Sequence, residues 1–92
     1  MVATGQATPD AYLSLGMLYI DVERFADAMK TLARGIEMDP SRADLHIQLA
    51  RAYTGLGEKD KAALLLARSD ELQRAARERA ARAAARTITP PK

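Results

Sequence analysis

The feature that most constrains the fold is an internal repeat with a period of 34 residues. Shifting the sequence by 34 positions aligns Leu15 with Leu49 and Tyr19 with Tyr53. The other aligned pairs are similar in character: Asp10 with Asp44, Gly16 with Ala50, Ala28 with Ala62, Leu32 with Leu66, and Met38 with Leu72. Because the matched positions fall at helical spacing, the repeat predicts two copies of one helical unit.

Each copy is predicted to contain two helices. In the first copy, Thr8 is a suitable N-cap, and Pro9 suits the first helical position, where no N–H is needed. A buried stripe follows at spacings of three or four residues, made by Tyr12, Leu15, Tyr19 and Val22. The second helix ends at Asp39-Pro40 and carries the apolar residues Phe25, Ala28, Met29, Leu32 and Ile36.

The second copy follows the same plan. Ser41 is predicted to cap its first helix, with Asp44 three residues later completing a capping box. The buried stripe continues through His46, Leu49, Ala50 and Tyr53. A turn at Gly55-Leu56-Gly57 then leads to a fourth helix lined by Leu64, Leu65, Leu66 and Leu72.

The last helix is predicted to be long. Neither glycine nor proline occurs between Glu58 and Thr89, and the stretch from Lys59 to Arg86 is rich in strong helix formers. We expect one helix of roughly 40 Å that runs toward Arg86. The alternative is a break near Gln73, followed by a short fifth helix.

Small residues recur where two helices of one unit are expected to cross. Gly16 and Ala50 lie on the first helices, and Ala28 and Ala62 lie on their partners. Larger side chains there would force the helices apart. The predicted architecture therefore depends on close backbone approach at each crossing.

These residues give the chain a resemblance to tetratricopeptide repeat proteins, whose signature is W-x2-L-G-x2-Y, then A-x3-F, then P. The first copy supplies Tyr12, Leu15, Gly16, Tyr19, Ala28, Leu32 and Pro40, and the second supplies His46, Leu49, Ala50, Tyr53, Ala62 and Leu66. The resemblance covers Pro9 to Leu72 and implies an all-α solenoid of two helix–turn–helix repeats with a C-terminal helical extension. The expected division is a flexible segment at 1–8, repeats at 9–42 and 43–76, and a basic helical extension with a disordered end at 77–92.

The resemblance also implies a function, because the first helix of each such repeat lines a concave groove that binds a partner peptide or helix. The corresponding residues here are Asp10, Leu13, Met17, Ile20, Asp21, Asp44, Ile47, Gln48, Arg51 and Thr54. Leu13, Met17 and Ile20 form a second apolar row on the first helix, which suits the side chains of a protein partner. Alternatively, this row mediates homo-oligomer formation or is buried internally. A further alternative is that the chain is a fragment of a larger scaffold protein.

Some members of the family hold a partner's C-terminal carboxylate with Lys and Asn side chains. The matching positions here are Leu13, Met17 and Gln48 and, if a fifth helix exists, Glu78 and Arg82. Leucine and methionine donate no hydrogen bonds to a carboxylate, and a glutamate repels it. That carboxylate clamp is therefore not expected in this chain.

Charge is distributed unevenly along the chain. Residues 1–72 hold eight Lys/Arg and eleven Asp/Glu, a net charge of −3, whereas residues 73–92 hold six Lys/Arg and one glutamate, a net charge of +5. Arg79, Arg82 and Arg86 share one helical face and form a candidate basic patch. This patch is a solvated helix end or a docking site for an acidic partner or an anionic surface. Nucleic acid is disfavoured because no aromatic residue is interleaved with the arginines.

The sequence contains no pattern typical of an enzyme or a metal site. Cysteine is absent, and the one histidine, His46, stands where the repeat usually places a packed aromatic residue. We therefore predict no catalytic, metal or cofactor site. Neither a signal peptide nor an apolar run long enough to span a membrane is visible, so we expect a soluble, cytoplasmic protein.

Overall fold

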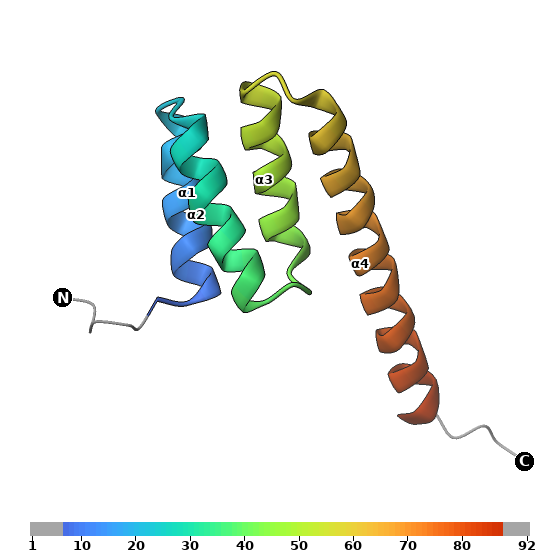
Figure 1. The fold of residues 1–92 in the computed structure, drawn as a ribbon. Coiled ribbons are helices and arrows are strands. Elements are labelled where there is room, and N and C mark those ends of the chain that lie inside the picture. Colours follow the sequence, from blue (N-terminus) through green and yellow to red (C-terminus); the bar gives the residue numbers. More distant parts are fainter. Residues whose placement is uncertain (1–6, 88–92) are drawn as a thin grey trace, which may run out of the picture.

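A computed structural model describes residues 7–87, which form four α-helices and no strand. The helices are α1 (Pro9–Asp21), α2 (Phe25–Met38), α3 (Ala43–Gly55) and α4 (Lys59–Thr87). Successive helices run antiparallel, α2 packs against both α1 and α3, and α4 packs against α3 (Figure 1). The all-α solenoid prediction is confirmed. Most of the predicted flexible segment 1–8 and the end of the extension, 88–92, lie outside the described residues.

The two turns within the helix pairs repeat in the predicted 34-residue register. After α1, the Arg24 N–H donates to the Tyr19 carbonyl at 2.8 Å, and after α3 the Glu58 N–H donates to the Tyr53 carbonyl at the same distance. Each bond lies at the end of a helix, and each turn contains one residue with a positive φ. This residue is Glu23 (φ 61°) in the first turn and Gly57 (φ 80°) in the second. Equivalent positions therefore adopt the same backbone geometry.

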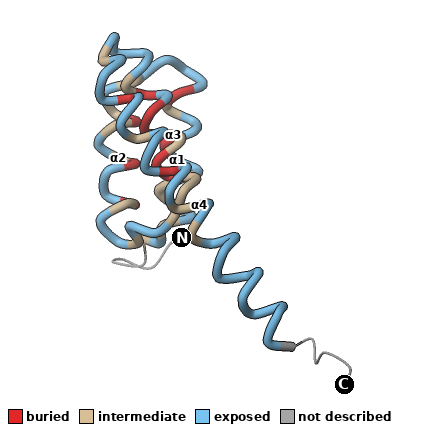
Figure 2. Tube along the Cα trace, turned by 90° about the vertical axis from the view of Figure 1, so that its right-hand side faces the viewer, coloured by how far each residue is buried: buried red, intermediate tan, exposed pale blue. Residues whose placement is uncertain are grey.

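The hydrophobic core lies between α1, α2 and α3. Ala28 and Leu32 of α2 and Leu45 of α3 are fully buried at its centre. At Gly16 of α1, an added Cβ would lie 2.5 Å from Cγ of Leu32. The predicted close approach of α1 and α2 is thus explained by glycine at this crossing. Figure 2 shows the buried residues concentrated in this part of the molecule.

The predicted apolar faces of α1 must be corrected. Leu15 and Val22, predicted to be buried, are 42% and 65% exposed. Ile20 is buried, and Leu13 packs against the core, so the row predicted to line a groove is partly internal. The sequence pattern was ambiguous because α1 is apolar on two faces, and the position of α2 decides which face is covered.

One predicted helix cap is confirmed and the other is wrong. The Thr8 hydroxyl accepts a hydrogen bond from the Ala11 N–H at 3.1 Å and caps α1. At α3 the N-cap is Arg42, with no side-chain cap. The Ser41 hydroxyl instead donates to the Asp39 carboxylate at 2.6 Å, within the turn after α2. A local serine–aspartate bond therefore replaces the predicted capping box.

The prediction of one continuous fourth helix is confirmed, because α4 has 29 residues without a break at Gln73. It is about 43 Å long, whereas the 13 residues of α3 span about 20 Å. Ala62 and Ser69 of α4 are buried against α3, but Leu64 is 72% exposed and Leu66 45% exposed, so these leucines do not all line the core. Residues 76–86 are exposed throughout and extend past the other helices; we call them the overhang (Figures 1 and 2).

Candidate functional site

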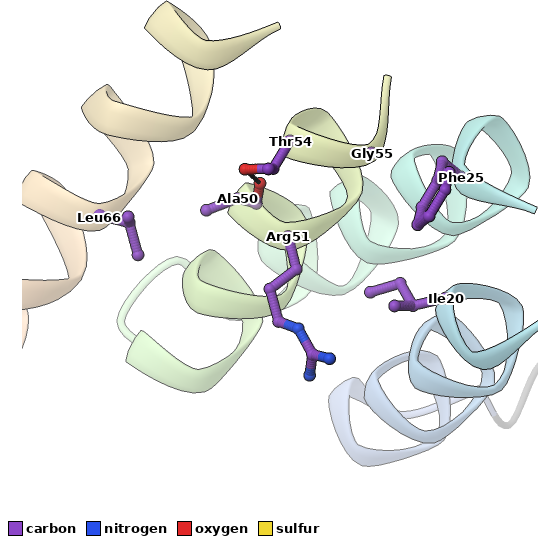
Figure 3. Close-up of a pocket in the computed structure, with 7 residues that line it drawn as sticks. All are labelled: Ile20, Phe25, Ala50, Arg51, Thr54, Gly55 and Leu66. Carbon is purple, nitrogen blue, oxygen red and sulfur yellow. Dashed lines mark hydrogen bonds between the residues drawn. The ribbon is translucent and has the colours of Figure 1, made fainter. Parts of the chain in front are cut away.

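An apolar hollow opens between α3 and its neighbours. It has a volume of about 440 Å³. Residues from all four helices line it, as Figure 3 shows: Ile20, Phe25, Ala50, Arg51, Thr54, Gly55 and Leu66. Such a hollow is large enough to receive an apolar side chain of another molecule.

Small residues on α3 allow the walls of the hollow to form. At Gly55, an added Cβ would lie 2.5 Å from atoms of the Phe25 ring, so the ring packs directly on the α3 backbone. Ala50 occupies the position that Gly16 holds in the first repeat, and it lines the hollow together with Leu66. A larger residue at either position would displace the wall or fill the space.

The hollow has one cation, the guanidinium of Arg51. Arg51 is exposed, and its Nη1 donates a hydrogen bond to Oε1 of Gln48 at 3.2 Å. Within residues 7–87 it forms no ion pair. The Thr54 hydroxyl donates to the Ala50 carbonyl at 2.9 Å, which leaves its oxygen as an acceptor. The hollow therefore combines apolar walls with an unneutralised positive charge.

The structure brings together only part of the predicted groove. Ile20, Arg51 and Thr54 line the hollow, whereas Met17 and Asp21 of α1 are exposed outside it. Leu13, Ile47 and Gln48 are half-buried. Three members of the hollow were predicted as packing residues (Phe25, Ala50 and Leu66), and Gly55 as a turn residue. The 34-residue alignment could have identified Leu66, because its equivalent Leu32 is buried beside the following helix α3, whereas no helix follows α4 in the described part of the chain.

Two predicted groove acids instead contact a basic residue of the chain itself. Arg42 forms ion pairs with Asp10 and Asp44, both at 2.8 Å. The hydrogen bonds from the Arg42 guanidinium lower the pKa of Asp44 and raise the pKa of Arg42. This cluster links the first turn of α1 to the first turn of α3, which are the first helices of the two repeats.

The predicted basic patch forms a second surface feature. Arg79, Arg82 and Arg86 lie on the overhang and, with Ala83, line a shallow hollow of about 320 Å³. No ion pair of these arginines occurs among the described residues. Three adjacent guanidinium groups favour carboxylate or phosphate ligands.

His46 is a buried residue, with only 5% of its surface exposed. Its Nδ1 lies 2.9 Å from the carbonyl oxygen of Arg42, and since a carbonyl only accepts, Nδ1 carries the proton. Within residues 7–87, no group of three His, Cys, Asp or Glu side chains could hold a metal ion. No helix in this part of the chain is long and apolar enough to cross a membrane.

Comparison with known proteins identifies one family. A family model described as tetratricopeptide repeat matches residues 19–87, which is more than half of the chain. Neither the curated proteins nor the solved structures include a match to this sequence.

Proposed function

This chain belongs to the tetratricopeptide repeat family, and we propose that it binds a partner protein by holding an apolar side chain of a peptide or helix in the hollow beside α3. Members of this family generally mediate protein–protein interactions. The observation that carries the proposal is the hollow itself, in which apolar side chains of α1, α2 and α4 line the same space as Arg51 and Thr54 of α3.

The same hollow indicates the chemistry of the partner. Leu66 is 45% exposed on α4, so an apolar side chain placed against it would remove its surface from water. Arg51 lacks a carboxylate partner in the described part of the chain, and a peptide carboxylate would supply one. The partner segment would therefore carry an apolar residue next to an aspartate, a glutamate or a C-terminus.

The experiment is a selection of peptides from a random peptide library on the intact chain, followed by measurement of the affinity of the enriched peptides. The enriched sequences should share an apolar residue close to an acidic group. Leu66→Glu should weaken their binding by at least tenfold, because it places a charge in the apolar wall. Arg51→Glu should have a similar effect on peptides with the acidic group.

The matched control is Leu64→Glu. Leu64 lies on the same helix as Leu66, but two residues apart on a helix is about 200°, so it faces away from the hollow. It is 72% exposed, and its substitution should leave peptide binding unchanged. Equal binding by the wild-type chain and Leu66→Glu, or no enrichment at all, would refute the proposal.

A further inference from the structure

A face of α1 is exposed although the same face of α3 is buried. Leu15 is 42% exposed and its equivalent Leu49 is 6% exposed; Leu18 is 62% exposed and its equivalent Ala52 is fully buried. The difference arises because α2 packs against α3, whereas no described helix precedes α1. We define the open face as four exposed residues at helical spacing, which are Ala11, Leu15 and Leu18 of α1 and Val22 at its C-cap.

Three carboxylates lie around the open face, and one of them, that of Asp10, is paired with Arg42. Asp10 and Asp21 of α1 lie on one side of it, and Glu23 follows at its C-terminal end. Asp21 and Glu23 have no cationic partner among residues 7–87. Both lie at the C-terminus of α1, where the helix dipole disfavours negative charge. A basic helix placed on the open face would relieve this arrangement.

The overhang has the complementary composition. It contains four arginines and one glutamate, and all of its residues are exposed. Ala76, Ala80 and Ala83 continue the face by which α4 packs on α3, so they form an apolar strip beyond the end of α3. The row of Arg79, Arg82 and Arg86 lies about 90° to one side of that strip.

The two surfaces match in length and in the placement of charge. The open face and the overhang each extend over about three helical turns. On each helix, seen with its N-terminus upward, the charged row lies on the same side of the apolar strip. An antiparallel pairing therefore places Asp21, at the C-terminal end of the open face, beside the arginine row, with both apolar strips in contact.

We propose that the open face of one copy is covered by the overhang of a second copy of this chain, held by Arg79 and Arg82 beside Asp21 and Glu23. The contact is heterologous, so each copy supplies one surface of each kind. Copies then form reciprocal dimers or longer chains. This self-association uses neither Arg51 nor Leu66 and is independent of the proposed peptide binding.

Two other arrangements fit the surfaces less well, the first because of its charges and the second because of its lack of apolar residues. Antiparallel pairing of two open faces would bring the carboxylates of both copies to the same side of the contact. Stacking of α1 on the body of another α4, as α3 stacks on α2, lacks the apolar residues that α2 provides. The positions of Phe25, Met29 and Ile36 are taken in α4 by Lys59, Ala63 and Asp70.

The experiment uses the full chain and two charge-reversed variants, each measured by sedimentation equilibrium. The wild-type chain should self-associate, and added salt should weaken the association. The variant with Arg79→Glu and Arg82→Glu should associate at least about tenfold more weakly, and so should the variant with Asp21→Arg and Glu23→Arg. Circular dichroism should report unchanged helicity for both variants, because all four positions are exposed.

Mixing the two variants gives the deciding result. The acidic overhang of the first variant then meets the basic α1 of the second, so association should return in the mixture and in neither variant separately. A wild-type chain that stays monomeric at low salt, or a mixture that stays monomeric, would overturn the proposal. So would self-association that Leu18→Asp abolishes but the arginine reversals leave intact, because that result indicates pairing of two open faces.

Discussion

Leu32 and Leu66 occupy equivalent positions of the two repeats but should contribute very differently to stability. Leu32 is fully buried between α1 and α3, whereas Leu66 is 45% exposed, since no helix follows α4 within residues 7–87. Leu32→Ala should reduce the free energy of unfolding by about 2–5 kcal/mol, through lost burial and the cavity left behind. Leu66→Ala leaves no closed cavity and removes a side chain that is half in water, so its effect should be about 1 kcal/mol.

Gly16 provides a second test of the same contact. A Cβ at this position would lie 2.5 Å from Cγ of Leu32, so Gly16→Ala should overpack the crossing by about 1–3 kcal/mol. The greater helix propensity of alanine offsets up to about 1 kcal/mol of this. With Leu32→Ala in the same chain the clash disappears, and Gly16→Ala should then stabilise the protein.

The measurement is urea unfolding, followed by far-UV circular dichroism at a concentration where the chain is monomeric. The proteins compared are the wild-type chain, Leu32→Ala, Gly16→Ala, the double variant with both changes, and Leu66→Ala. Equal slopes with urea concentration would show that the midpoint differences report stability. The reasoning would be refuted if Leu66→Ala were as destabilising as Leu32→Ala. It would also be refuted if Gly16→Ala had the same effect in both backgrounds, since contacting residues should be coupled.

Three further predictions concern the turns, the ion-pair cluster and the overhang. Gly57→Ala should destabilise the chain by about 1–2 kcal/mol, because its φ of 80° strains any residue with a Cβ; no steric clash adds to this cost, since no neighbour lies within 4 Å. Glu23→Gly at the equivalent turn should stabilise the chain by about 1 kcal/mol, because it removes the same strain. Thermal unfolding measures both changes. Arg42 lowers the pKa of Asp44 in the folded state, so stability should decrease as the pH falls below about 4, and Arg42→Ala should flatten this dependence in acid titrations followed by circular dichroism. Deletion of residues 77–92 should change the free energy of unfolding of the monomer by less than about 0.5 kcal/mol, because residues 77–86 are exposed; a larger loss would show that this part of α4 supports the core.

Much of the fold follows from local signals in the sequence. Thr8 and Pro9 start α1, and the absence of glycine and proline after Glu58 explains the unbroken α4. The 34-residue repeat predicted the pairing of helices, because glycine or alanine recurs at each crossing. The cap at Ser41 could not be predicted reliably, since its hydroxyl bonds equally well to the neighbouring Asp39.

The candidate site depends more on tertiary structure. Ile20, Arg51 and Thr54 were identified from their helix positions, but Phe25 and Leu66 enter the hollow only because of how α2 and α4 pack beside α3. Burial also distinguishes residues that the sequence pattern treats alike. Leu15 and Leu49 have the same place in the repeat, yet α2 covers only Leu49, because solvent exposure depends on the neighbouring helix and not on the residue's own position in its helix.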